Sequence, residues 1–149
     1  WNGGPTAGLG WVKEELVDAI GWSRRGEFAY VRRAVPTRPR LRVVNAKGKE
    51  IAAQDGVTEV LWSPDGAELA VNRHGNVWVW SLAGGGLAGA WRQVTAFAPK
   101  REPINEEDAV QNPQRIRDLA WSPDGKQVVF GVHQPGPGRR LALVDVGKR

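Results

Sequence analysis

The sequence predicts an all-β protein built from a repeated unit of about four short strands. Two observations predict it. The pentapeptide Trp-Ser-Pro-Asp-Gly occurs twice, at 62–66 and at 121–125, and the residues around both copies share one order of apolar and polar positions. Chance recurrence of five identical residues is very unlikely in a chain of 149 residues.

A third, divergent copy of the repeat begins 40 residues before the first. VDAIGWSRRG (17–26) has the apolar positions and the Trp-Ser pair of VTEVLWSPDG (57–66) and IRDLAWSPDG (116–125), with Arg24-Arg25 in place of Pro-Asp. We call Trp22, Trp62 and Trp121 the marker tryptophans. Their spacings of 40 and 59 residues set the length of the repeat.

Runs typical of β-strands follow each marker. The first set is EFAYVRR (27–33), AELAVNR (67–73) and KQVVFGV (126–132), and the second is LRVVNA (41–46), VWVWSL (77–82) and LALVDV (141–146). These runs are rich in β-branched, aromatic and leucine residues. The fourth strand has the weakest pattern, and we place it at 49–53, 90–97 and 9–13.

The residues after each marker predict a hairpin turn between two strands. Proline presets φ, aspartate bonds nearby backbone, and glycine adopts positive φ without strain. Pro64, Asp65 and Gly66 form one such turn, and Pro123, Asp124 and Gly125 form the other. The turn at Arg24-Arg25-Gly26 lacks the proline, and we expect it to be looser.

A period near 40 residues with four short strands is the signature of a β-propeller blade. We predict blades at 14–53, 54–97 and 113–149, an outer strand at 9–13 from a preceding or closing blade, and an insertion at 98–115. Propellers typically hold four to eight blades. The chain is therefore expected to be part of a larger or oligomeric ring, completed by another copy or another chain, and not a stable free monomer.

The motif apolar-x-Trp-Ser-Pro-Asp-Gly, with a later strand ending in Val-Asp-Val, resembles TolB-type, WD-repeat-like propeller blades. The resemblance covers most of the chain, and in HGNVWVWSL (74–82) Ser81 stands where a WD repeat has aspartate. Such blades occur in periplasmic TolB-like proteins, in bacterial WD-repeat proteins and in the propellers of prolyl-oligopeptidase-type peptidases. The resemblance favours a periplasmic or other extracytoplasmic location, although the sequence itself does not fix the compartment.

Composition sets outer limits on function. The chain has no cysteine, which excludes disulfides and thiol chemistry, and no apolar run long enough to span a membrane. It begins at Trp1 and holds no methionine, so we expect a processed or truncated piece. A net charge of +5 permits acidic partners without requiring them.

No catalytic, cofactor or metal site is predicted. The sequence lacks the Gly-x-Ser-x-Gly elbow of a serine hydrolase, and three of its serines follow the marker tryptophans, where a turn needs them. His74 and His133 are expected to be solvated residues in loops between second and third strands. No cluster of metal ligands and no phosphate-binding glycine loop is present.

Candidate partner-binding residues lie in a basic stretch between residues 24 and 49 and at one tryptophan outside the repeat. They are Arg32, Arg33, Arg38, Arg40, Arg42 and Trp91. The stretch is either a solvated blade exterior, a site for an acidic protein, or, least favoured, a nucleic-acid site, because no interleaved aromatics accompany it. The insertion 98–115 is either a plain surface loop or a binding element.

The function predicted from these features is a non-enzymatic propeller scaffold for protein–protein interaction, similar to TolB. The alternative is the substrate-gating propeller of a prolyl-oligopeptidase-like serine peptidase, whose catalytic domain this chain lacks.

Overall fold

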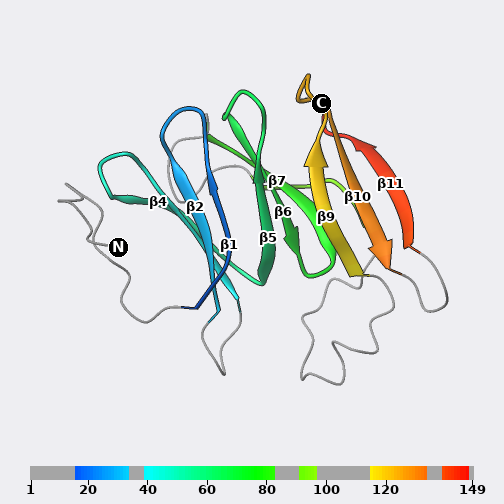
Figure 1. Cartoon of the computed structure of the whole chain (residues 1–149), viewed down its shortest axis with the longest axis horizontal. Coiled ribbons are helices and arrows are strands. Elements are labelled where there is room, and N and C mark those ends of the chain that lie inside the picture. The colour runs from blue at the N-terminus through cyan, green and yellow to red at the C-terminus, as the bar shows by residue number, and fades with distance from the viewer. Residues whose placement is uncertain (1–15, 34–38, 83–90, 97–114, 134–138, 148–149) are drawn as a thin grey trace, which may run out of the picture.

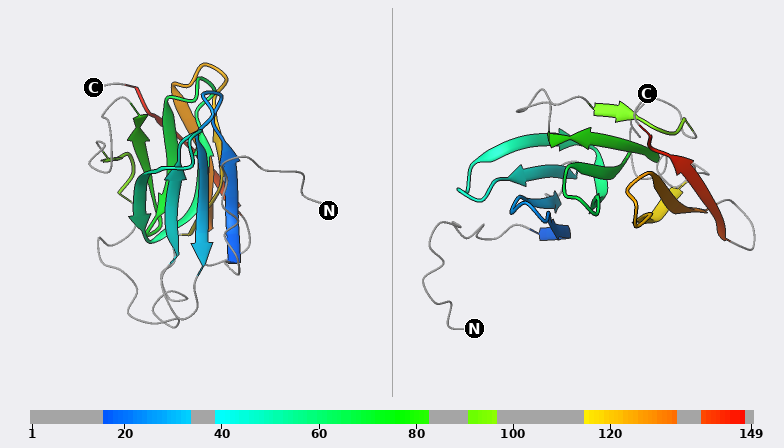
Figure 2. Two further views of the ribbon diagram at one scale, coloured as in Figure 1. Left: turned by 90° about the vertical axis from the view of Figure 1, so that its left-hand side faces the viewer. Right: turned by 90° about the horizontal axis from the view of Figure 1, so that it is seen from above.

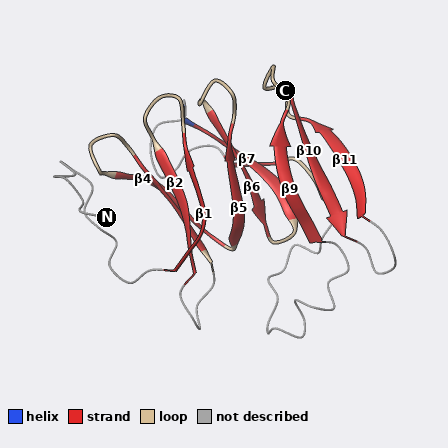
Figure 3. Cartoon of the chain, in the orientation of Figure 1, coloured by secondary structure: helices blue, strands red, loops and turns tan. Residues whose placement is uncertain are grey.

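A computed structural model describes residues 16–33, 39–82, 91–96, 115–133 and 139–147. These residues form strands joined by turns; they contain no α-helix, and the short helical segment in Figure 3 is a single 3₁₀ position at Leu82. The strands make three separate antiparallel sheets. The predicted fold class, an all-β partial propeller, is confirmed.

Each sheet is a meander in which neighbours in sequence are neighbours in space. The first sheet holds β1 (Leu16–Trp22), β2 (Phe28–Arg33), β3 (Arg40–Val44) and β4 (Glu50–Asp55). The second holds β5 (Val57–Trp62), β6 (Glu68–Arg73), β7 (Asn76–Ser81) and β8 (Trp91–Gln93). The third holds β9 (Arg115–Trp121), β10 (Gln127–His133) and β11 (Arg139–Asp145).

The three sheets stand face to face in sequence order (Figure 1). Their first strands are in contact, β1 with β5 and β5 with β9. Seen from above, β1 and β9 lie toward one edge of the molecule, and β8 lies at the opposite edge (Figure 2). This is the arrangement of propeller blades whose first strands face a common axis. The outer strand expected at 9–13 and the insertion at 98–115 lie outside the described residues, apart from Arg115 in β9.

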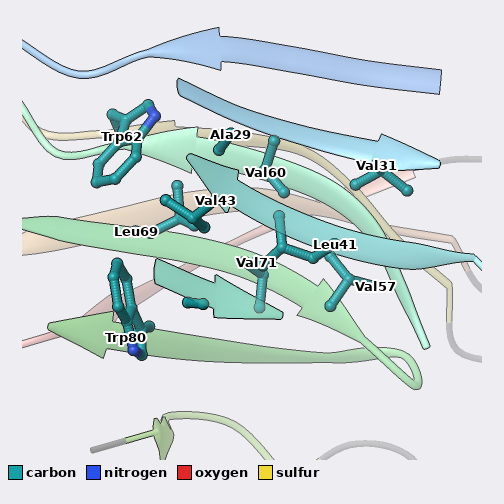
Figure 4. Close-up of a cluster of buried hydrophobic side chains, with 11 residues drawn as sticks. Ala29, Val31, Leu41, Val43, Val57, Val60, Trp62, Leu69, Val71 and Trp80 are labelled. Carbon is teal, nitrogen blue, oxygen red and sulfur yellow. The ribbon is translucent and has the colours of Figure 1, made fainter. Parts of the chain in front are cut away.

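Apolar side chains fill both spaces between the sheets. Between the first and second sheets, Leu41, Val43, Leu69 and Val71 are fully buried with Trp80 (Figure 4). A second cluster, which includes Val77, Val79 and Phe130, fills the space between the second and third sheets. Burial of this apolar surface, at roughly 25 cal/mol per Å², holds neighbouring blades together.

Marker tryptophans bind each blade to the one before it. Trp62 Nε1 donates to the Gly21 carbonyl at 3.1 Å, and Trp121 Nε1 donates to the Leu61 carbonyl at 3.0 Å. Each acceptor directly precedes the marker of the preceding blade. The repeated tryptophan therefore packs between blades, and its indole sets the register of one blade against the next.

The two Ser-Pro-Asp-Gly turns have the same hydrogen bonds. Ser63 Oγ donates to Asp65 Oδ1 at 2.6 Å, and this oxygen also accepts from the Ala67 amide at 3.0 Å. Ser122 and Asp124 repeat both bonds in the third blade. The glycine φ is +70° at Gly66 and +69° at Gly125. Glycine is required at both positions because other residues are strained there.

We expected the turn of the first blade, at Arg24-Arg25-Gly26, to be looser than the other two, but it is shorter. Ser23 N bonds the Glu27 carbonyl four residues on, whereas Ser63 N bonds the Glu68 carbonyl five residues on. The turn is thus one residue shorter. Ser23 Oγ donates to the Glu27 carboxylate, which replaces the missing aspartate as the partner of the serine.

Candidate functional site: the basic end of the sheets

Arginines gather at the end of the sheets opposite the marker turns. β2 and β6 end on arginine, and β3, β9 and β11 begin with arginine. The cross-strand register places these residues in rows at one end, drawn at the bottom of Figure 1. We call this group the basic end. Its members are Arg32, Arg33, Arg40, Arg73, Arg115, Arg139 and Arg140.

Asp55, the last residue of β4, forms an ion pair with an arginine of the basic end. Arg40 Nη1 lies 2.9 Å from Asp55 Oδ1, and both side chains are about half exposed. Arg42, two residues further into β3, lies 3.5 Å from Glu50 at its Nε. Two of the arginines predicted to bind a partner are therefore paired with carboxylates of the neighbouring strand.

Arg73 links the first and second sheets at the basic end. Its guanidinium lies 4.8 Å from the centre of the Trp78 ring, a cation–π contact. When the side-chain amide of Gln54 is oriented with its oxygen toward Arg73, this oxygen accepts a hydrogen bond from Arg73 Nη2 at 2.9 Å. Desolvation by burial lowers the pKa of Arg73, and the nearby Asp55 carboxylate opposes that shift.

His74 lies in the loop between a second and a third strand, as expected from the sequence, but its ring is half-buried and not fully solvated. His74 lies in the β6–β7 turn with φ of +49°, is half-buried, and rests on the backbone of Gly56. A β-carbon at Gly56 would come within 2.1 Å of the His74 ring, so only glycine fits there. His133 is the last residue of β10 and pairs in register with Arg139 and Arg115.

The structure brings some of the predicted partner-binding residues together and separates others. Arg32 is half-buried, Arg33 ends β2, and Arg38 lies outside the described residues. Trp91 is half-buried against Trp80, with ring centres 6.2 Å apart, at the opposite edge of the second sheet. The sequence analysis did not single out Arg73, Arg115, Arg139 or Arg140. These arginines recur where a strand-like run meets a loop, and this recurrence in the sequence could have identified them.

Exposed aromatic rings are absent from the described part of the basic end. Among described residues the exposed large apolar side chains are Trp22, Leu141 and Leu143, and Trp22 lies at the marker turn. The ranges that the structure describes contain no group of three histidine, aspartate or glutamate residues that could hold a metal ion. Nor do they contain a helix long and apolar enough to cross a bilayer. Within the described residues, the basic end thus offers guanidinium groups, such as those of Arg40 and Arg140, without an exposed aromatic ring.

Comparison with solved structures finds a β-propeller domain among the matches. The β-propeller domain of the Trilobed protease from Pyrococcus furiosus matches with a TM-score of 0.62 and 18% identity, over 88% of this chain and 39% of that one. A eukaryotic initiation factor matches with a TM-score of 0.58 and 12% identity, over 87% and 29% of the two chains. An acylaminoacyl peptidase from Pyrococcus horikoshii matches with 0.56 and 16%, over 79% and 17%.

These similarities support propeller blades as the fold of the chain, which spans less than half the length of each of these structures. No protein-family model and no curated protein matches the sequence.

Proposed function

We propose that this chain is a non-enzymatic propeller scaffold, of the TolB-like kind, that binds an acidic segment of a protein partner through the basic end. The observation that carries the proposal is the gathering of arginines from three consecutive sheets at one end. Loops and strand ends on a rigid sheet frame are where such scaffolds place their binding groups.

Arginine is suited to this partner because its planar guanidinium binds carboxylates with two parallel hydrogen bonds. The Arg40–Asp55 pair shows that a carboxylate fits between strand ends at this surface. Single-stranded nucleic acid is less favoured, because its binding sites combine positive charge with exposed aromatic rings. Trp78, which lies beside Arg73, is half-buried beneath that guanidinium.

A fluorescein-labelled decaglutamate peptide tests the proposal by fluorescence anisotropy at low and high salt. We expect salt-sensitive binding that weakens about tenfold in the Arg139→Glu/Arg140→Glu double variant, because two charges are reversed. The matched control is Lys47→Glu/Lys49→Glu, the same change in charge at the opposite end, and it should bind like the unchanged chain. Absence of binding at low salt, an equal loss in the control, or tighter binding of a single-stranded oligonucleotide would overturn the proposal.

A second candidate function is the substrate-gating propeller of a serine peptidase. The similarity to the propeller of the Trilobed protease favours it. Sequencing the gene on both sides of the segment that encodes this chain decides between the two. A Gly-x-Ser-x-Gly segment in a hydrolase domain of the same polypeptide would support gating, and a gene without one would support the scaffold.

A further inference from the structure

Asp55 lies in a row of charged residues at the basic end of the first sheet. In the cross-strand register, Arg32 of β2 pairs with Arg40 of β3, and Arg40 pairs with Asp55 of β4. Arg40 Nη1 lies 2.9 Å from Asp55 Oδ1, and the two side chains are 46% and 56% exposed. The Arg40 guanidinium therefore already binds a carboxylate, and it does so where solvent reaches both groups.

Arg73 of the second sheet interacts with the same carboxylate. Desolvation lowers the pKa of Arg73, and attraction to the Asp55 carboxylate opposes that shift. The Arg73 guanidinium lies 4.8 Å from the centre of the Trp78 ring, and its Nη2 lies 2.9 Å from the Gln54 amide oxygen when that oxygen is oriented toward it. These two contacts hold Arg73 in place. One carboxylate thus attracts guanidinium groups of two neighbouring blades, with Arg40 as its hydrogen-bonded partner.

The backbone next to Asp55 is fixed, whereas the Asp55 side chain is exposed. Gly56 follows directly, and its amide donates to the Pro39 carbonyl at 2.8 Å. The His74 ring packs on Gly56 so closely that a β-carbon there would lie 2.1 Å from it. An exposed ion pair such as Arg40–Asp55 is weak, because water competes for both charges. The Asp55 carboxylate can therefore leave Arg40 by rotation of its side chain alone, with little loss of stability.

We propose that Asp55 occupies a carboxylate subsite of the basic end, and that a carboxylate of the acidic partner segment displaces it from Arg40. This inference rests on the proposed function and adds to it the place where one partner carboxylate binds and the residue that competes with it. The incoming carboxylate binds the planar Arg40 guanidinium at the junction of the first and second blades, where Arg73 also attracts it. Asp55 turns into solvent, and its competition lowers the affinity of the basic end for the partner.

Displacement differs in its consequences from two simpler roles for Asp55. If Asp55 acted only as a negative charge near the site, it would weaken binding equally with and without Arg40. If it served only the stability of the fold, its replacement would alter unfolding and leave affinity unchanged. Displacement requires that the effect of Asp55 on binding depend on Arg40, which a double-mutant cycle measures.

Fluorescence anisotropy with the labelled decaglutamate peptide tests the proposal on four chains: the unchanged chain, Asp55→Asn, Arg40→Gln and the double variant. Asp55→Asn should bind about threefold more tightly, because Arg40 no longer has to leave an exposed ion pair. In the Arg40→Gln background the same substitution should change the affinity little. Circular dichroism and urea denaturation check that all four chains fold with similar stability.

Glu50→Gln is the matched control on the same strand. Glu50 lies 3.5 Å from Arg42, is partly exposed and loses the same charge as Asp55 on substitution. It stands at the other end of β4, roughly 15 Å from Asp55 at about 3.3 Å per residue. That separation exceeds the Debye length of about 8 Å at 0.15 M ionic strength, at which the titrations are made. Glu50→Gln should therefore bind like the unchanged chain.

The outcomes separate this inference from the proposed function. Asp55→Asn that binds no more tightly than Glu50→Gln, or that gains equally with and without Arg40, would overturn displacement and leave the proposed function in place. Absence of binding by the unchanged chain and by Asp55→Asn alike would overturn both. A gain in affinity that disappears with Arg40 is the result that displacement predicts.

Discussion

The second and third blades contrast in how their faces are covered. The second blade has a neighbour on both sides, and its inward and outward apolar side chains are buried in two clusters. The third blade buries Val128 and Phe130 against the second, yet leaves Leu141 and Leu143 exposed. The difference shows that one repeated pattern produces burial where a neighbouring blade is present and exposed leucines where the described residues include no further blade.

The largest expected effect on stability comes from truncating a leucine on a covered sheet face, compared with truncating a leucine on an exposed sheet face. Leu41→Ala should lower the free energy of unfolding by about 2–5 kcal/mol, because Leu41 is fully buried between sheets. Leu141→Ala, at the equivalent position of the third blade, should change it by less than about 0.5 kcal/mol, because Leu141 is exposed. Urea denaturation at high dilution measures both. Equal losses would contradict the equivalence drawn between the two faces.

Replacing marker tryptophans compares a covered and an exposed blade face through the loss of a single hydrogen bond. Trp62→Phe removes the donor to the Gly21 carbonyl and should cost about 1–3 kcal/mol. Trp22→Phe should cost less than about 0.5 kcal/mol, because the Trp22 ring is largely exposed. Thermal unfolding of both variants at the same protein concentration checks this order.

Glu59 adds a pH-dependent contact between the second and third blades. Its Oε1 accepts from the Leu119 amide at 2.8 Å, and burial raises its pKa above the usual 4.5. The folded state therefore binds this proton more tightly than the unfolded state. The resulting stability is full below pH 4.5 and is lost as pH rises through the raised pKa. Glu59→Gln should flatten this part of the stability–pH profile, measured by urea denaturation, whereas an unchanged slope would contradict the assignment.

Asp65 should act in the opposite direction and with the smallest effect. Hydrogen bonds from the Ser63 hydroxyl and the Ala67 amide lower its pKa below the usual 3.8. Its contribution is therefore present above pH 3.8 and is lost on acidification through the lowered pKa. Because the carboxylate is exposed, we expect less than about 1 kcal/mol. Asp65→Asn should reduce the acid sensitivity of unfolding, and a variant that is more acid-sensitive than the unchanged chain would contradict this cause.

The sequence was sufficient to predict the all-β fold and the hairpin turns, because Ser-Pro-Asp-Gly specifies its own backbone locally. The role of the marker tryptophans in packing between blades was also predictable from their recurrence. Which carbonyl each indole reaches was not, because that depends on the stagger of separate sheets. The shorter first turn was missed since Glu27 lies outside the four residues that define the motif.

The candidate site was predicted less completely than the fold. The basic stretch around Arg32 and Arg40 was recognised, but its pairing with Asp55 requires the cross-strand register, which residue order alone does not supply. Arg73 and Arg139 belong to distant repeats, and only the three-dimensional placement of strand ends brings them to the same end as Arg40. The expectations for 9–13, 98–115 and Arg38 concern residues that the structure does not describe and stay predictions.

Exchange of the indole N–H protons with solvent, followed by nuclear magnetic resonance, tests most directly whether each marker tryptophan joins one blade to the one before it. We predict slow exchange at Trp62 and Trp121, whose indoles donate to the preceding blade, and fast exchange at the exposed Trp22, with Trp→Phe variants assigning the signals. Fast exchange at Trp62 or Trp121, or exchange at Trp22 as slow as theirs, would contradict the account.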